Sequence, residues 1–144
     1  MIVNNRKASF EYFFLMTFEA GIQLVGSEVK SIRAGKINLT DAYCVFNGNE
    51  LMVKNLHISG YDQASYNNHT PLRERKLLLK RKELNKLQNK LKDKGLTIIP
   101  IKLYTSNRNF VKLEIALAKG KKLYDKRETL KEKDVRRELS RNVD

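Results

Sequence analysis

Short apolar and aromatic runs separated by turn residues dominate the first half of the chain, and this pattern predicts β-strands. Residues 10–18 hold five aromatic residues among nine. The run is apolar on both faces, as in a strand of a small barrel capped by a helix. Asn47-Gly48 separates the apolar runs 42–46 and 51–56. Asn-Gly between two such runs is typical of a tight β-hairpin.

A second hairpin is predicted from residues 96–104 and 110–118, which flank the polar stretch 105–109. In its second strand apolar residues alternate with Lys112 and Glu114, which indicates one buried and one wet face. Residues 59–69 are rich in Gly, Ser, Asn and Asp and predict a loop.

Two helices are predicted between these strands. Residues 26–35 form a short one, with Ser27 as N-cap, Glu28 in the first turn and Gly35 just past the end. Residues 70–94 form a long one, in which Thr70 is the N-cap and Pro71 the first helical residue. Three leucines at heptad spacing give this helix its apolar stripe: Leu77, Leu84 and Leu91.

These elements predict a fold that is mainly β with flanking helices. Residues 1–118 are expected to form a small closed β-barrel of the OB type, a fold whose curved face binds nucleic acid. Residues 119–144 are expected to form a basic C-terminal tail that is disordered alone and becomes helical when bound. With ten basic and six acidic residues, this segment is too polar to bury a core of its own.

The net charge of the chain indicates the kind of partner that it binds. The chain carries 29 Lys and Arg against 16 Asp and Glu, a formal charge of +13. So large an excess in a small domain predicts a polyanionic partner, with nucleic acid the first candidate and an anionic membrane surface the second. A single cysteine, a polar N-terminus and the lack of a long apolar run favour a cytoplasmic protein without a membrane span. We expect a monomer.

Catalytic and metal-binding chemistry finds little support. Cys44, His57 and His69 have no recognised metal-ligand spacing, and Cys44 is expected to be a buried, inert thiol. Nucleophile and phosphate-loop motifs are lacking. The carboxylates are scattered among an excess of cations, which keeps them ionised rather than raising their pKa. This pattern gives little support to a pair of carboxylates that acts in acid–base catalysis. We therefore predict no catalytic residue, no cofactor and no metal site, and do not expect an enzyme.

Two basic clusters are candidates for RNA contact. Residues 73–94 carry ten basic and three acidic residues, and Arg73-Glu74-Arg75-Lys76 stands at the predicted start of the long helix. Exposed N–H groups and paired guanidiniums at such a place bind phosphate, although a solvated helix face is the alternative. Residues 119–127 form the second cluster, where Tyr124 could stack on a base. The alternative there is a solubilising tail.

These residues are compatible with three classes of function. A protein specific for one RNA, a general RNA-binding or ribosomal protein, and an RNA-processing enzyme share the charge and the fold. Competition with bulk tRNA separates the first two, and cleavage or modification of bound RNA would mark the third.

Several short blocks resemble the small protein B (SmpB) family, the SsrA-binding proteins that carry transfer-messenger RNA to stalled bacterial ribosomes. They follow the family order across nearly the whole chain, at residues 5–8, 19–22, 26–35, 71–79, 118–122 and 125–127. The resemblance implies an OB-like barrel that binds the tRNA-like domain of transfer-messenger RNA. It further implies a tail that reaches the small-subunit decoding centre and the empty mRNA channel, and folds there as a helix.

The resemblance also assigns roles to residues. RNA binding falls on Glu28, Lys30, Arg33, His69, Arg73, Arg75, Lys76, Lys119, Lys121 and Lys122. The decoding-centre role falls on Gly120, Tyr124, Asp125, Lys126 and Arg127. Tyr124 stands where many members have His, so stacking is kept but imidazole hydrogen bonding is not. The chain after Arg127 is somewhat short for the family.

Overall fold

A computed structural model describes residues 2–60, 69–106 and 110–121. Its helices are α1 (Arg6–Glu11), α2 (Gly26–Arg33) and α3 (Arg81–Lys90). Its strands are β1 (Ile2–Asn4), β2 (Tyr12–Ile22), β3 (Ile37–Asn38), β4 (Tyr43–Asn47), β5 (Glu50–Lys54), β6 (His57–Ile58), β7 (Arg75–Leu78), β8 (Leu96–Thr105) and β9 (Val111–Gly120).

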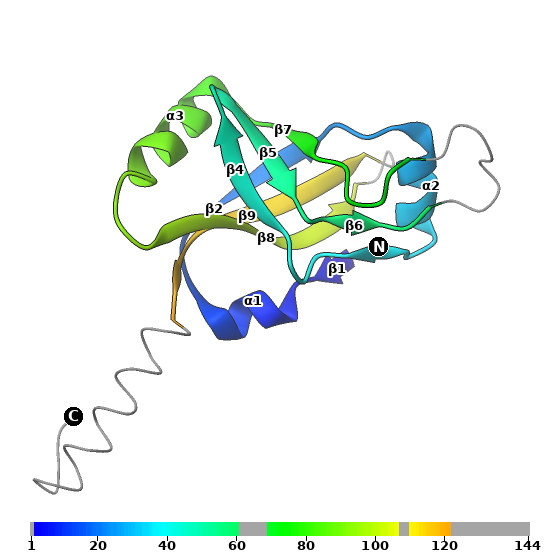
Figure 1. Ribbon diagram of the computed structural model, residues 1–144, viewed down its shortest axis with the longest axis horizontal. Coiled ribbons are helices and arrows are strands. Elements are labelled where there is room, and N and C mark those ends of the chain that lie inside the picture. The colour runs from blue at the N-terminus through cyan, green and yellow to red at the C-terminus, as the bar shows by residue number, and fades with distance from the viewer. Residues whose placement is uncertain (1, 61–68, 107–109, 122–144) are drawn as a thin grey trace, which may run out of the picture.

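The strand pairings run in a closed circuit. The order is β8, β4, β5, β7, β2, β9 and back to β8, and the pairs are antiparallel. β1 adds to the outside of β8, and β3 pairs with β6 in a separate ribbon. The predicted class, mainly β with flanking helices, is confirmed, and the circuit closes as a small barrel requires (Figure 1).

Both predicted hairpins are confirmed. Asn47 pairs with Glu50, which leaves Gly48 and Asn49 as a two-residue loop, and Gly48 adopts the positive φ of 64° that such a loop needs. β8 and β9 form the second hairpin and pair from Leu96 with Lys119 to Thr105 with Val111.

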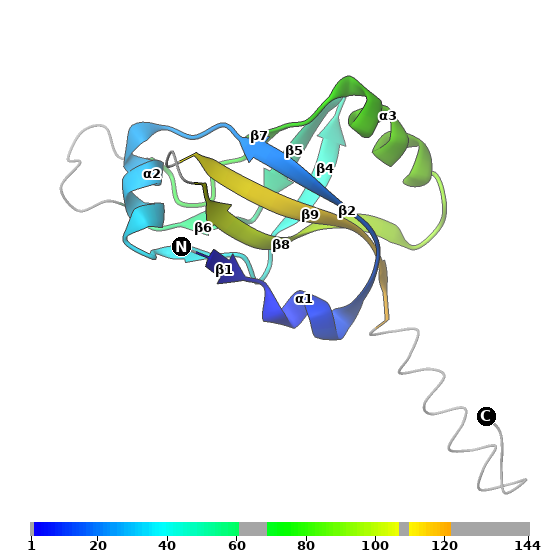
Figure 2. The same ribbon diagram turned by 180° about the vertical axis from the view of Figure 1, so that it is seen from behind.

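The core fills the barrel and is closed at two ends by helices. The inward side chains of the strands are almost fully buried, among them Leu51, Val53, Ile98, Leu103, Leu113 and Ile115. Ile32 of α2 and Leu87 of α3 pack into the same cluster. The two helices lie at opposite ends of the barrel in both views (Figures 1 and 2).

The predicted long helix over residues 70–94 is wrong. Residues 75–78 form β7, which pairs with β5 and β2, and the helix α3 covers only residues 81–90. Burial alternates along β7, because Arg75 and Leu77 point inward while Leu78 is exposed. Without β7 the circuit would be open between β5 and β2, so pairing across the barrel prevails over local helix propensity.

The N-terminal prediction also needs correction. The strand expected over residues 10–18 begins at Tyr12, and Phe10 belongs to α1, a helix that the pattern did not predict. Asn5 starts α1, because its side-chain oxygen accepts from the N–H of Ala8 at 3.2 Å. The expectation that both faces of this strand are covered fails at Phe13 and Leu15, which are 44% and 52% exposed.

β9 continues to Gly120, two residues past the predicted end of the domain at residue 118. Lys121 holds this end to α1, because its N–H donates to the backbone oxygen of Glu11 at 2.8 Å. Residues 122–144 lie outside the described residues, so the division into a barrel and a tail stays a prediction.

Candidate nucleic-acid interface

α2 is fixed at both of its ends by local hydrogen bonds. Val25, not the predicted Ser27, is the N-cap, and its N–H donates to the Glu28 side chain at 2.9 Å. Gly35 has the positive φ of 77° predicted for it just past the helix end. The N–H groups of Gly35 and Lys36 donate to the carbonyls of Ile32 and Ser31, which forms a Schellman motif.

Glu28 lies at the centre of a charged group with two arginines, of which Arg75 is buried and Arg73 is half-exposed. The Glu28 side chain is fully buried and accepts from Arg73 at 2.7 Å and from Arg75 at 2.5 Å. Arg75 is also fully buried, and it donates to the backbone oxygens of Leu56 at 2.7 Å and Pro71 at 3.2 Å. We call Glu28, Arg73 and Arg75 the charged triad; it ties α2 to β7.

Glu28 and Arg75 stay charged despite their burial. Burial by itself would raise the pKa of Glu28, but hydrogen bonds from Arg73, Val25 and Arg75 outweigh it and lower that pKa below its ordinary value. Burial lowers the pKa of Arg75, and Glu28 opposes this shift. A guanidinium begins from so high a pKa that Arg75 remains protonated.

The lowered pKa of Glu28 predicts a pH dependence of stability. The carboxylate stabilises the fold above the ordinary glutamate pKa, and this contribution is lost as pH falls through the lowered folded-state pKa. We therefore expect the difference in unfolding free energy between the natural chain and Glu28→Gln to be steady near neutral pH and to shrink in acid. Urea unfolding over a pH series measures it. A difference independent of pH would contradict the charged triad.

His69 joins α2 to β6 by a second polar link. Its Nε2 is 2.7 Å from the backbone oxygen of Ile58, and its Nδ1 is 2.8 Å from the Ser27 hydroxyl. Because a carbonyl only accepts, Nε2 carries the proton in neutral His69, and Nδ1 accepts from Ser27. The loop residue predicted to touch RNA thus also holds the N-terminal turn of α2.

The structure separates the predicted RNA-binding residues into three places. Around α2 lie Lys30 and Arg33, both exposed, together with half-buried His69 and the charged triad. Lys76 lies on β7 and pairs with Glu50 at 2.8 Å. Lys119, Gly120 and Lys121 lie at the end of β9, at the other end of the barrel from α2. Lys122, Tyr124, Asp125, Lys126 and Arg127 lie outside the described residues.

Glu28 and Arg75 differ from the other candidates because neither exposes its side chain. Any part they play in RNA binding is indirect in this structure, through the position they give to α2 and to half-exposed Arg73. Their predicted assignment stays a prediction in that limited sense. The sequence pattern predicted Arg75 as a phosphate-binding guanidinium at a helix start, with a solvated helix face as the alternative, and contained no signal of its burial.

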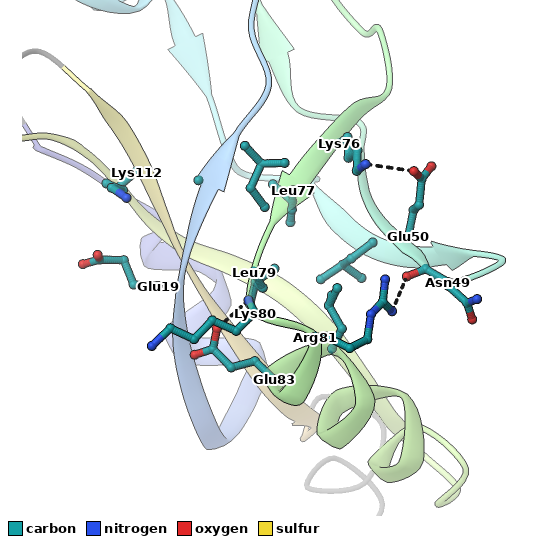
Figure 3. A pocket seen from close by; sticks show the side chains of 14 residues that line it. Glu19, Asn49, Glu50, Lys76, Leu77, Leu79, Lys80, Arg81, Glu83 and Lys112 are labelled. Carbon is teal, nitrogen blue, oxygen red and sulfur yellow. Dashed lines mark hydrogen bonds and ion pairs between the residues drawn. The ribbon is translucent and has the colours of Figure 1, made fainter.

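A cleft of about 650 Å³ opens beside β7, between β2, the β4–β5 turn and the start of α3. Four of its lining residues are cations, Lys76, Lys80, Arg81 and Lys112. Figure 3 shows them around the cleft with three acidic neighbours, Glu19, Glu50 and Glu83. Of the four cations, only Lys76 was assigned individually to RNA binding, while Lys80 and Arg81 belong to the basic cluster over residues 73–94. Only Lys112, on β9, lies far from the other three cations in sequence, so no local motif joins it to them.

Gly21 shapes the floor of this cleft. A Cβ at Gly21 would lie 3.3 Å from Cβ of Leu78, closer than ordinary contacts allow. The glycine therefore lets β7 approach β2 where the two strands pair.

Other functional signals are few in the described part of the chain. Residues 2–60, 69–106 and 110–121 contain no group of three or more His, Cys, Asp or Glu that could hold a metal ion. Within the same residues no helix has the length and apolar character to cross a membrane. Cys44 is buried as predicted, and burial raises the pKa of its thiol.

Comparison with known proteins finds a matching family and similar proteins. Residues 2–144 match the family described as SmpB protein. The SsrA-binding protein of Cytophaga hutchinsonii is 56% identical over 139 residues, covering 96% of this chain and 91% of that protein. The SsrA-binding protein of Phocaeicola vulgatus is also 56% identical, covering 96% and 93%.

A solved structure extends the likeness to three dimensions. It is described as "tmRNA-SmpB: a journey to the center of the bacterial ribosome", and one of its chains superimposes with a TM-score of 0.71 at 46% identity. The match covers 84% of this chain and 85% of that chain. With the family match over nearly its full length and relatives above half identity, the chain belongs to the SmpB protein family.

Proposed function

We propose that this protein binds the tRNA-like domain of transfer-messenger RNA and delivers it to stalled ribosomes for trans-translation. The observation that carries the proposal is membership of the SmpB family over residues 2–144, with relatives named SsrA-binding proteins. Family identity makes this an RNA-binding protein and not an enzyme, and the function needs no cofactor. Its place of work is the cytoplasm, where ribosomes stall.

The described surface supports RNA recognition by shape and charge. A net charge of +13 attracts a polyanion, and a rigid barrel holds the cations at fixed positions. Lys30 and Arg33 project from α2, and the cations of the cleft lie beside β7. Cations on a preformed surface suit a folded RNA, which proteins recognise by backbone and shape more than by base sequence.

The tail supplies the second half of the function in this proposal. The segment from Gly120 to Arg127 follows β9, which ends at Gly120. We assign its residues to the decoding centre, where the tail replaces codon–anticodon pairing and folds as a helix in the empty mRNA channel. Folding on binding suits a segment too polar to form a core alone.

The direct test is to purify the protein from cells and sequence the RNA bound to it. Transfer-messenger RNA should dominate, and excess bulk tRNA should not displace it. Recovery of many unrelated RNAs would indicate a general RNA-binding protein instead. Shortened or modified RNA after long incubation with a divalent metal would indicate a processing enzyme.

We expect Lys30→Ala with Arg33→Ala to weaken binding to the tRNA-like domain and to reduce its salt dependence. For every phosphate that a removed cation had neutralised, the slope of log affinity against log salt should become shallower by about 0.9. Filter binding at several salt concentrations measures both quantities. Lys92→Ala with Lys94→Ala removes the same charge from the exposed segment after α3 and is the matched control. Equal effects of the two double variants would refute local binding at α2.

A further inference from the structure

Asn5 is a buried asparagine whose amide group hydrogen-bonds to the backbone with both of its polar atoms. Its Oδ1 accepts from the N–H of Ala8 at 3.2 Å, and its Nδ2 donates to the carbonyls of Leu39 at 3.2 Å and Pro100 at 2.9 Å. Its own N–H donates to the carbonyl of Ile101 at 2.9 Å. One residue thus fixes the start of α1 both to β8 and to the connection between β3 and β4.

α1 depends on these hydrogen bonds for its position. It has only six residues, and a helix this short is not stable by itself in water. Its buried residue, Ala8, packs with Ile99 and Ala118, whereas Phe10 is 76% exposed. Because so little apolar surface holds α1 to the barrel, the hydrogen bonds of Asn5 decide where its last turn lies.

The last turn of α1 holds the chain where β9 ends. The N–H of Lys121 donates to the carbonyl of Glu11, the last residue of α1, at 2.8 Å. The Lys121 ammonium lies 5.0 Å from the centre of the Phe13 ring, which is a cation–π contact. Gly120 pairs with Tyr12 at the start of β2. Both views show this end of β9 beside the turn from α1 into β2 (Figures 1 and 2).

We propose that Asn5 is a positioning residue for the tail, because through α1 it fixes the point from which the chain after Lys121 starts. The inference rests on the proposed function and deepens it, since the residues assigned to the decoding centre begin at Gly120. A short segment reaches its site more readily from a fixed origin. Each residue that is released widens the volume that the segment searches and lowers its effective concentration at the site. Asn5 therefore acts on tagging and not on RNA binding.

The test compares Asn5→Ala with Asn38→Ala in the full chain. Both changes remove a side-chain oxygen that accepts from a backbone N–H, that of Ala8 at 3.2 Å and that of Thr40 at 2.8 Å. The Asn38 bond stays within one connection, whereas Asn5 ties α1 to β8. In reconstituted translation with stalled ribosomes and equal amounts of folded protein, Asn5→Ala should slow tagging about two- to fivefold. Asn38→Ala should tag at the natural rate, and both should bind the tRNA-like domain normally.

A distance measurement separates positioning from a loss of stability. Cys44 is the single cysteine of the chain and is buried, so spin labels attach selectively to cysteines introduced by Thr17→Cys, at an exposed position of β2, and Leu123→Cys. The distribution of distances between the two labels should broaden when Asn5→Ala is added. It should stay the same when Asn38→Ala is added. Thermal melting sets a temperature at which every variant is folded.

Asn5→Ser is the milder variant should alanine prevent folding. A serine oxygen still caps α1, but the amide donors to Leu39 and Pro100 are lost, so the change in distances should have the same direction and a smaller size. Tagging at the natural rate by the folded Asn5 variant would overturn the inference, and so would slower tagging without a broader distance distribution. Both outcomes leave the proposed function standing. It fails separately if the natural chain does not tag stalled peptides.

Discussion

Replacing Glu28 with alanine is expected to destabilise the fold by about 3–5 kcal/mol, because it leaves a buried guanidinium without its counter-charge. Arg75 is fully buried, and its other hydrogen bonds go to backbone carbonyls. Carbonyl dipoles solvate a cation only in part, so the loss of the carboxylate is not made up. Urea unfolding at neutral pH, followed by circular dichroism, gives the change in unfolding free energy.

Glu83→Ala is the matched control for removing a carboxylate that caps a helix. The Glu83 side chain accepts from the N–H of Lys80 at 3.0 Å in an exposed position, so its loss should cost only about 1 kcal/mol. Glu28→Leu combined with Arg75→Met removes the buried charges together. This double variant should recover most of the stability, because apolar replacement of a whole buried ion pair is often neutral. A destabilisation by Glu28→Ala smaller than that by Glu83→Ala would contradict the role given to the triad.

Local signals in the sequence were sufficient to predict where the chain forms a turn and where a helix ends. Asn47-Gly48 marked a hairpin, and Gly35 marked the end of α2, because each glycine adopts a positive φ that other residues resist. Long apolar runs were sufficient to predict β8 and β9, which are consecutive in the chain and pair with each other. Such features depend on residues close in sequence, and a pattern analysis can therefore find them.

The errors concern features that depend on distant residues. Residues 75–78 have good helix propensity, and they form a strand because β5 and β2 supply partners on either side. Arg75 is buried because Glu28, 47 positions away, neutralises it. In the cleft, Lys112 of β9 lies with Lys76, Lys80 and Arg81, and only the closed barrel brings these distant segments together. No spacing along the chain contains that information.

The same separation in space explains why the two proposed activities should be separable by mutation. The α2 surface and the end of β9 lie at opposite ends of the barrel, with the folded core between them. A change beyond β9 therefore need not disturb the cations around α2 or in the cleft. The charge of residues 124–144 also favours activities that are separable by mutation, because this segment carries seven basic and six acidic residues. Their removal costs one net positive charge out of thirteen.

A chain that ends after Leu123 is therefore expected to bind the tRNA-like domain normally but to fail in tagging stalled peptides. Its barrel, Lys119 and Lys121 are intact, and its charge is nearly unchanged, so affinity and salt slope should match those of the full chain. Tagging should be abolished, because nothing then occupies the decoding centre. A reporter on an mRNA without a stop codon, in cells lacking their own copy, measures tagging.

A pair of substitutions separates the tail motif from tail length. Lys126→Ala with Arg127→Ala alters residues assigned to the decoding centre, and Lys131→Ala with Lys133→Ala removes the same charge a few residues further on. If the decoding centre reads the residues near Gly120, the first pair should reduce tagging more than the second, with RNA affinity unchanged in both. Equal reductions would mean that total charge in the mRNA channel matters more than the motif. Normal tagging by the chain that ends at Leu123 would remove the tail from the mechanism and leave delivery to the barrel alone.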